Sequence, residues 1–500
     1  MSHSKVSARL TEAVSPEIYS GIFAPRLKSF QDIFDPLSDI NKAHVIMLRE
    51  QGLLSDAHAA QLARGILSME AAGADAVPLD PAREDAYFNY EAHLMNEVGA
   101  DVGGRLHTGR SRNDIMATLD RLRGRTVLID VIDALLKVRA TALEQAETYA
   151  DVVMPGYTHL QPAQPMTYGF YLAGVAQALE RDSQRLIDTL THMNVCPLGA
   201  AAFAGTPFAI DRKRTAELLG FDDYVDNALD AVASRDFLLE SISGMSLLAI
   251  LWSRVAQDYY VWTTHEFGLI EFPDSVATTS SIMPQKKNPV VLEYLKGRCG
   301  HIVAALVAAT MSIKGTHFSH SGESSREGIS GFWDTASEVV RCLELFDLVL
   351  RTARPVRENA QRQAARDFST VTALADLMVR DHDLSFRAAH HVVGAVVRQA
   401  MDKQVCADRI DVDMVESAAI EQLGKPLGID ADAVRACLDP VENVKARISS
   451  GGPSPATLRV HVSAARERLG GTKTTLEGWR TRIERAHAAL QATTSEVASR

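Results

Sequence analysis

The sequence predicts an all-α protein built around a bundle of long helices, and three observations support this prediction. Between Phe237 and Glu271 there is no proline, and apolar residues recur in steps of three and four, which is typical of one helix face. A helix of that length is about 50 Å long and must bury its apolar stripe against other helices. Further long proline-free stretches supply those partners: Asp114 to Val153, Met166 to Asn194, Val290 to Lys314 and Gly331 to Arg351. No segment shows the sustained alternation expected of strands.

The length of 500 residues exceeds what one hydrophobic core usually fills, so two or three domains are expected. The pattern predicts an N-terminal helical domain at residues 1–110, a central long-helix bundle at 111–365 and a small helical C-terminal domain at 366–500. A polar stretch at Glu358–Asp367 precedes the third region. The clearest loop within that region is "ISSGGPSPATLR", from Ile448 to Arg459.

Composition narrows the class of partners and the compartment. The net charge of -11 argues against nucleic acid or an anionic membrane surface as a partner. The longest uncharged apolar run, Ile302 to Ile313, is shorter than the ~20 residues that cross a bilayer, and the first residues lack a signal-peptide core. Five scattered cysteines form neither a disulfide framework nor a zinc-binding spacing. We therefore expect a cytoplasmic protein with no cofactor and no bound metal.

Three polar stretches interrupt the helical pattern. They are "RLHTGRSRND" (Arg105–Asp114), "MPGYTHLQPAQP" (Met154–Pro165) and "TTSSIMPQKKNPVVLE" (Thr278–Glu293). Each lies at an end of a predicted long helix. If those helices pack side by side, the three stretches can meet in space.

The residue types in these stretches suit an anionic substrate. Cationic groups that can neutralise carboxylates are Lys286, Arg110 and Arg112. Hydrogen-bond donors are available from Asn113, Asn288, Thr158, Ser111 and Ser281. Histidine is a residue type suited to proton transfer, which makes His159 a candidate acid or base, and a hydroxyl of Ser280 or Ser281 can act as a base if a cation and backbone amides stabilise its alkoxide. Taken singly, each is also an ordinary feature: a solvated loop histidine, a serine turn, or an N-cap. No metal-ligand cluster, phosphate loop or dinucleotide fingerprint accompanies them.

The motifs resemble a known family. "SSIMPQKKN" matches the GSSxMPxKxN pattern of the fumarase/aspartase superfamily, with Thr279 where glycine is usual. Together with "LHTGRSRND", "PGYTHLQPAQP" and "NALDAVASRDF", it resembles the argininosuccinate lyase branch. The resemblance runs from "EDAYFNYEAHL" to "TALADLMVRDHDLSFRAAH" and so covers most of the chain.

The resemblance implies a fold and a reaction. The fold has three mostly helical domains in a homotetramer, whose active sites each draw loops from three subunits. The reaction is that of a carbon–nitrogen lyase. A succinyl group bonded through Cα to a nitrogen leaves as fumarate after removal of a Cβ proton, through an aci-carboxylate dianion that the site must stabilise.

The resemblance also implies residue roles. Ser280 is the base, and Lys286 and Asn288 hold the carboxylate that becomes the dianion. His159 protonates the leaving nitrogen, with Glu293 as its charge-relay partner. The remaining substrate-binding residues on the succinyl side are Ser111, Arg112, Asn113, Thr158, Ser281 and Met283. The serine loop is expected to close over the substrate.

One stretch departs from the branch. After the equivalent of "MSIKG", argininosuccinate lyases typically read like "LPLAYNKDLQEDKE", whereas this chain reads "THFSHSGESSREGIS" from Thr316 to Ser330. An ungapped count puts His320 at the tyrosine, Ser325 at the glutamine and Gly328 at the lysine that serve the arginine half of the substrate. This predicts a changed amine, with His320 and Arg326 recognising a further negative group.

Lyases of this branch that act on aminopolycarboxylates, such as ethylenediamine-N,N'-disuccinate (EDDS), are therefore the favoured interpretation. Argininosuccinate cleavage and a catalytically silent, crystallin-like homologue are the alternatives. Adenylosuccinate lyase shares the chemistry, but "HTGRSRND" and "QKKNP" argue against it.

Overall fold

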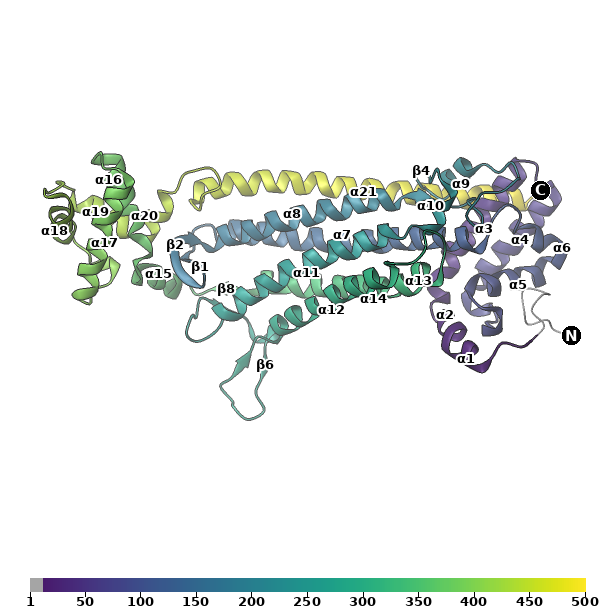
Figure 1. Ribbon diagram of the computed structural model, residues 1–500, viewed down its shortest axis with the longest axis horizontal. Helices are drawn as coiled ribbons and strands as arrows, with labels where there is room; N and C mark the ends of the chain where they lie inside the picture. Colours follow the sequence, from purple (N-terminus) through teal and green to yellow (C-terminus); the bar gives the residue numbers. More distant parts are fainter. Residues whose placement is uncertain (1–11) are drawn as a thin grey trace.

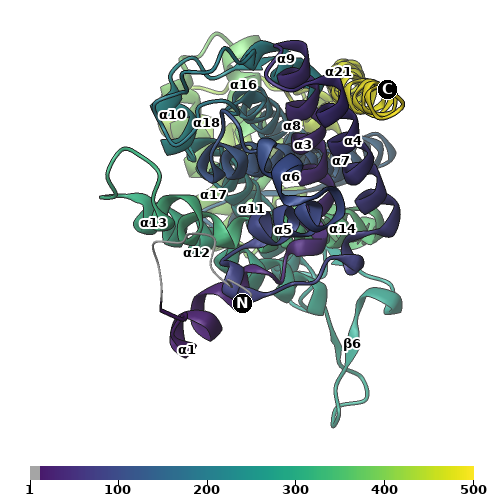
Figure 2. The same ribbon diagram turned by 90° about the vertical axis from the view of Figure 1, so that its right-hand side faces the viewer.

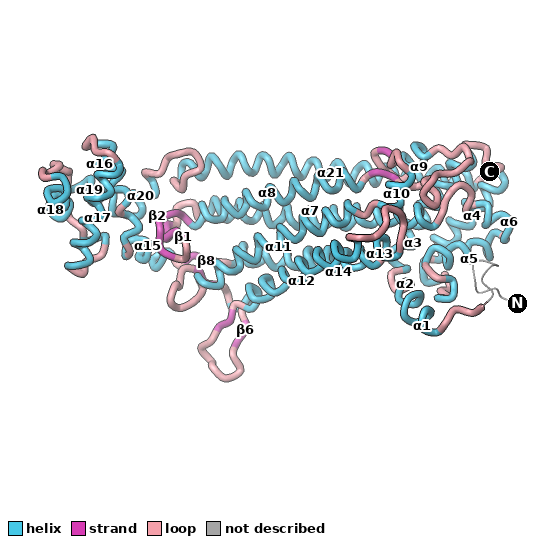
Figure 3. The backbone as a smooth tube through the Cα atoms, in the orientation of Figure 1, coloured by secondary structure: helices cyan, strands magenta, loops and turns pink. Residues whose placement is uncertain are grey.

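The computed structural model describes residues 12–500 and is elongated. A bundle of long helices forms the body, an N-terminal group of helices covers one end, and a small C-terminal group covers the other (Figure 1). Strands occur only as short pairs among the described residues (Figure 3). The predicted all-α class is confirmed.

Five helices build the bundle: α7 (Arg112–Thr148), α8 (Tyr168–Met193), α11 (Asp236–Trp262), α12 (Val290–Ile313) and α14 (Ser330–Thr352). Helix α7 packs against α8 and α14, and α11 packs against α12 and α8. The stretch predicted to be helical from Phe237 to Glu271 ends at Trp262, which makes α11 about 40 Å long rather than 50. The reason is local. A turn follows in which the Gly268 N–H donates to the Thr264 carbonyl, and Gly268 has a φ of 54° that favours glycine.

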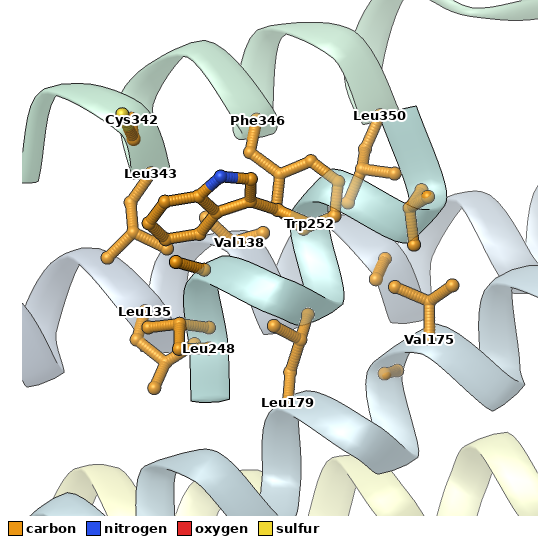
Figure 4. Close-up of a cluster of buried hydrophobic side chains, with 14 of the residues drawn as sticks. Leu135, Val138, Val175, Leu179, Leu248, Trp252, Cys342, Leu343, Phe346 and Leu350 are labelled. Carbon is orange, nitrogen blue, oxygen red and sulfur yellow. The ribbon is translucent and has the colours of Figure 1, made fainter. Parts of the chain in front are cut away.

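The bundle core is centred on the apolar stripe of α11. Trp252 is fully buried among Leu248, Leu343 and Phe346 (Figure 4), and its Nε1 donates to the Leu295 carbonyl at 3.1 Å. Each large apolar side chain buried in this way stabilises the fold by roughly 1.5–3 kcal/mol. Among residues 12–500, α11 is the one helix that is long and apolar enough to cross a membrane. The uncharged run Ile302–Ile313, noted in the sequence, does not meet that test. The apolar stripe of α11 is instead the centre of a protein core.

The N-terminal region has its own core, centred on α3 (Phe30–Glu50). Its helices are α1 (Pro16–Ile18), a π-helix (Tyr19–Phe23), α2 (Ala24–Arg26), α3, α4 (Asp56–Ala72), α5 (Ala86–Val98) and α6 (Ala100–Arg105). Two short helices lie between α8 and α11 in the sequence, α9 (Arg212–Leu218) and α10 (Ala228–Ala233). Helix α9 packs on α3 of the N-terminal region. The end-on view shows this region covering the bundle (Figure 2).

The C-terminal group is smaller than predicted. Its helices are α15 (Arg357–Arg366), α16 (Thr372–Asp381), α17 (Phe386–Asp402), α18 (Val412–Leu423), α19 (Ala431–Leu438) and α20 (Pro440–Lys445). Helix α21 (Pro455–Ala498) then runs back along the bundle to the N-terminal region (Figure 1). Its Leu458 and Trp479 belong to the bundle core, and its Leu490 to the N-terminal core. The predicted domain at 366–500 is therefore wrong beyond residue 454, because the apolar stripe of α21 matches these two cores.

Four two-stranded pairs connect the helices. They are β1 (Val153–Thr158) with β2 (Gln161–Thr167), β3 (Val195–Cys196) with β4 (Asp223–Tyr224), β5 (Ile270–Glu271) with β8 (Arg354–Pro355), and β6 (Thr278–Thr279) with β7 (Lys287–Asn288). The hairpin of β1 and β2 was not predicted, because its prolines break strand alternation. A two-stranded ribbon tolerates prolines since both of its outer edges are free.

Candidate active site

The stretch around Ser280 forms a loop, residues 278–288, here called the serine loop. Strands β6 and β7 pair Thr278 with Asn288 and Thr279 with Lys287 at its base. At its start, Ser280 Oγ accepts the backbone N–H groups of Ile282 at 3.3 Å and Met283 at 3.1 Å. Two aligned amide donors stabilise negative charge on an oxygen. The local geometry therefore suits a serine alkoxide.

The serine loop projects away from the bundle and is exposed (Figures 1 and 2). Ser281, Met283 and Lys286 are all exposed in the isolated chain. Lys287 is held by the Phe272 carbonyl at 2.6 Å and Asp274 at 2.7 Å. Lys286, in contrast, forms no ion pair with any residue between 12 and 500. It is therefore the cation of this loop that is available to a ligand.

The second candidate stretch is the hairpin of β1 and β2. Thr158 pairs with Gln161, so His159 and Leu160 form a two-residue turn in which both residues have positive φ, 56° and 57°. This backbone geometry matches the type I′ turn favoured in two-residue hairpins. The left-handed region costs a leucine roughly 1–2 kcal/mol, and such strain concentrates at functional sites. The turn holds the His159 imidazole, exposed, at the tip.

The third stretch forms the N-terminus of α7. Ser111 caps the helix by accepting the Asn113 N–H, and its own N–H donates to Asp114 Oδ1 at 2.8 Å. A helix N-terminus attracts anions through its unpaired N–H groups and its dipole. The Asn113 side chain donates to the Ala202 carbonyl at 3.0 Å. Burial raises the pKa of Asp114 to about 6, despite backbone N–H groups that favour its charged form.

The arginines beside this cap are held by protein partners. Arg112 lies 2.8 Å from Glu84 and 3.2 Å from Asp85, which is almost fully buried. Arg110 is buried in the N-terminal region, where it donates to the Asn41 side chain at 2.8 Å. The expectation that Arg110 neutralises a substrate carboxylate is therefore wrong. Its side chain points into the N-terminal core.

The stretch that departs from the branch, Thr316–Ser330, lies beside the same cap of α7. Arg326 lies 2.9 Å from Asp85, so the Asp85 carboxylate forms ion pairs with both Arg112 and Arg326. His320 Nδ1 has no hydrogen-bond partner among the described residues. Burial, reinforced by the charges of Arg235, Arg326 and Arg112, lowers the pKa of His320 to about 4. Its imidazole is therefore neutral at physiological pH.

Within one chain the candidate residues fall into two groups at opposite ends. Helix α7 has 37 residues and is about 55 Å long; Ser111 precedes it, and the hairpin carrying His159 follows it. The serine loop precedes α12, whereas His320 and Arg326 follow that helix (Figure 1). The expectation that side-by-side helices bring the three stretches together is not met within one chain.

The suggested relay between His159 and Glu293 is likewise not formed in the single chain. The Glu293 carboxylate accepts a hydrogen bond from the Tyr260 hydroxyl at 3.2 Å. Both His159 and Glu293 are exposed, and no hydrogen bond or ion pair joins them between residues 12 and 500.

Several groups beside the candidate residues were not singled out by sequence reasoning. Glu84 and Asp85 begin the quoted segment "EDAYFNYEAHL", yet adjacent acids before a helix usually indicate only an N-cap, and Asp85 is one. Thr158 also lines a cleft of about 690 Å³, whose opposite wall includes Arg447 and Ile448. That contact joins residues about 290 positions apart, so no local pattern could predict it.

Comparison with known proteins decides the family. A family model described as lyase matches residues 39–304, and one described as argininosuccinate lyase C-terminal matches residues 368–445. Argininosuccinate lyase 1 of Shouchella clausii is 39% identical, covering 89% of this chain and 90% of its own. This chain belongs to the argininosuccinate lyase branch of the fumarase/aspartase superfamily. It is a carbon–nitrogen lyase.

Other relatives of this lyase agree. The argininosuccinate lyase of Methanosarcina acetivorans is 37% identical, covering 92% of each chain. The crystal structure of EDDS lyase in complex with formate is 31% identical and superposes with a TM-score of 0.87, covering 98% of this chain and 97% of that one. A variant of EDDS lyase with bound fumarate superposes with a TM-score of 0.86, at 31% identity and the same coverage.

Proposed function

We propose that this lyase reversibly eliminates fumarate from an N-substituted aspartate whose amine half carries further carboxylates, such as EDDS. The observation that carries the proposal is the geometry of Ser280, whose Oγ accepts hydrogen bonds from two backbone N–H groups. Ser280 lies in the same exposed loop as Lys286, which forms no ion pair with any residue between 12 and 500. A serine in that setting can work as an alkoxide base.

The reaction begins with proton transfer. Ser280 Oγ removes the Cβ proton, and the electron pair moves into the adjacent carboxylate to give the aci-carboxylate dianion. Lys286 and Asn288 stabilise that dianion more than they stabilise the substrate carboxylate, which is the requirement for rate acceleration. The pair then forms the Cα–Cβ double bond as the Cα–N bond breaks. His159, oriented by Glu293, gives the leaving nitrogen its proton, so fumarate and the amine are released.

The succinyl group is held by hydrogen-bond donors from all three stretches. Ser111, Arg112 and Asn113 act from the N-terminus of α7, Thr158 from the hairpin, and Ser281 and Met283 from the serine loop. In the isolated chain, Asn113 and Arg112 bind the Ala202 carbonyl and the acids Glu84 and Asp85. Substrate binding therefore exchanges protein partners for ligand carboxylates at these two residues.

A homotetramer with shared active sites accounts for the separation of these groups. The helices α11 and α12 expose large apolar side chains, namely Leu247, Ile250, Tyr294, Val307 and Met311. Exposed apolar patches of this kind mark protein interfaces. Copies of the chain packed through these helices in antiparallel fashion would bring the hairpin end of one to the capped end of another. We also propose that the enzyme works in the cytoplasm.

The proposal for the amine rests on the stretch Thr316–Ser330, in which His320 and Arg326 adjoin the cap of α7. Argininosuccinate is the second candidate, because the curated relatives at 36–39% identity are named argininosuccinate lyases.

Fumarate absorbance measured with purified enzyme and each substrate separates these candidates. We expect fumarate from EDDS and little or none from argininosuccinate. Release from argininosuccinate alone would overturn the choice of amine. Release from neither, at any enzyme concentration, would favour a silent structural homologue.

A further inference from the structure

We infer that the cleft between the hairpin of β1 and β2 and the loop 446–453 binds a zwitterionic amino acid with an apolar side chain. The cleft offers one cation for the carboxylate of such a ligand, Arg447, and one anion for its ammonium group, Asp376. The inference goes beyond the proposed lyase reaction and does not depend on it.

The cleft is large enough for a small molecule and has two well-defined walls. Its volume of about 690 Å³ lies within the range of about 300–1,000 Å³ that is typical of ligand sites. One wall is the hairpin, through residues 156–158 and 163–166, and the other is the loop 446–453 with Asp376 of α16. Helix α20 packs on both strands of the hairpin, so the loop that follows α20 is held against them.

A buried asparagine holds the Arg447 side chain at the cleft. Asn443 donates from Nδ2 to the carbonyls of Thr370 at 3.2 Å and Cys437 at 3.1 Å, which fixes its amide. Its Oδ1 then accepts a hydrogen bond from Arg447 Nε at 3.1 Å. The two terminal nitrogens of Arg447 have no hydrogen-bond or ion-pair partner among residues 12–500. A guanidinium with free terminal N–H groups is well suited to bind a carboxylate.

Asp376 supplies the opposite charge on the same cleft. It is exposed, and its carboxylate has no hydrogen-bond or ion-pair partner among the described residues. Burial lowers the pKa of Arg447, and the charge of Asp376 opposes that shift without forming an ion pair with it. A ligand that carries both charges can therefore pair with each of these two residues, which do not pair with each other.

The other charged groups beside the cleft already have partners. A second cavity of about 360 Å³ shares Asp376 and Arg447 with the cleft. Its remaining charged residues are neutralised by neighbours: Arg380 lies 2.9 Å from Asp381, and Glu442 lies 2.7 Å from a lysine on the same helix. One unpaired positive group and one unpaired negative group match an amino acid better than a dicarboxylate or a diamine.

Much of the remaining wall is apolar. The apolar residues of the hairpin that line the cleft include Tyr157, Pro165 and Met166. Across from them lies Ile448, whose surface is 77% exposed. An apolar side chain on the ligand would remove this surface from water, which favours binding. The expected ligand is therefore an amino acid with a hydrophobic side chain.

L-Leucine and two analogues test the requirement for both charges. The first analogue, 4-methylpentanoate, lacks the amine, and the second, 3-methylbutylamine, lacks the carboxylate. Titration calorimetry on the full-length protein should show binding of L-leucine, with each analogue about tenfold weaker or more, because one charged hydrogen bond is missing. No binding of L-leucine at about 10 mM, or equal affinity for L-leucine and 4-methylpentanoate, would overturn the inference.

Two variants test the residues that provide the charges. Arg447→Gln and Asp376→Asn should each weaken L-leucine binding by about tenfold or more. Asp376 is exposed and unpartnered among the described residues, so its variant keeps the fold and remains a valid test where Arg447→Gln loses stability. The matched controls Arg387→Gln and Asp413→Asn alter exposed residues outside the cleft and should leave the affinity unchanged. Unchanged affinity in Asp376→Asn, or equal losses in the controls, would overturn the site.

Discussion

The serine loop and the arginine cluster differ in how far one chain completes them. The serine loop, residues 278–288, is largely exposed and is held at its base by a two-residue ladder, and its Lys286 forms no ion pair with any of the residues 12–500. The arginine cluster, made of Arg112 and Arg326 around Asp85, is assembled from three segments far apart in the sequence and fixed by a buried carboxylate. The difference is that the contacts of one chain fix the arginine cluster, whereas they leave the serine loop and the hairpin of His159 at the opposite end of the bundle from Ser111.

The energetics of the two regions follow from burial. Exposed segments with few buried contacts, such as the serine loop, change conformation at little cost in free energy. Asp85 is almost completely buried, and a buried charge without its partners costs several kcal/mol. The serine loop is therefore held only at its base, while the arginine cluster is fixed by buried ion pairs.

The largest effect is expected from Ser280→Ala. Loss of a general base typically lowers the rate by a hundredfold to ten thousandfold, so we expect kcat to fall about a thousandfold. The measurement is initial fumarate release, with succinate inhibition as a check on binding. Ser275→Ala, an exposed serine just before the loop, should stay within about twofold of the unaltered enzyme. Substantial activity in Ser280→Ala would contradict the assignment of the base.

Mixing two inactive variants tests whether the site is shared between chains. If Ser280 and Asn113 of one site come from different chains, co-expressed Ser280→Ala and Asn113→Ala should recover about a quarter of full activity, as random assembly leaves that fraction of sites intact. Ser280→Ala mixed with Lys286→Ala is the matched control, because both residues lie in one loop. That pair should recover nothing. No recovery in the first mixture would place Ser280 and Asn113 in the same chain.

His159→Asn examines the proton donor without disturbing the hairpin. Asparagine tolerates the left-handed conformation that His159 adopts, so the turn should persist. We expect kcat to fall about a hundredfold, with a smaller loss for substrates whose leaving amine is already a weak base. Leu160→Asn, at the adjacent position with the same backbone conformation, should change kcat by less than about threefold. Equal losses in the two variants would mean that the turn, rather than the imidazole, matters.

The smallest effect is expected from an ordinary ion pair remote from both regions. His487 on α21 lies 3.0 Å from Asp39 on α3, and this hydrogen bond raises the pKa of His487. A raised histidine pKa contributes stability below about pH 6.5, and the contribution is lost as pH rises through the higher folded-state value. Because His487 is half exposed, His487→Ala should lower the free energy of unfolding by only about 0.5 kcal/mol at pH 6.

Thermal unfolding at pH 6 and pH 9 measures this last effect, which should vanish at the higher pH. His461→Ala, also on α21 but without an ion pair between residues 12 and 500, should show no such pH dependence. A loss that persists unchanged at pH 9 would mean that His487 stabilises α21 by packing instead.

Local patterns predicted the elements well, and contacts across the sequence account for the differences. The periodicity of α11 and the capping sequence at Ser111 can be read in a few consecutive residues, because helix periodicity and caps act within a few turns. Arg110 was assigned to a ligand although it is buried beside Asn41, since the residue type does not say which way a side chain points. The return of α21 was missed because its apolar stripe does not identify the surface that it covers.

The sequence by itself determined the helical class, the family and the chemical character of the three polar stretches, because these depend on periodicity and on residue types at fixed spacing. Only the tertiary structure decided that Ser280 and Ser111 lie at opposite ends of the bundle, and that Arg112 and Arg326 share Asp85. These relations depend on which helix faces pack together. That choice is made by the burial of the whole apolar surface, which no short segment contains.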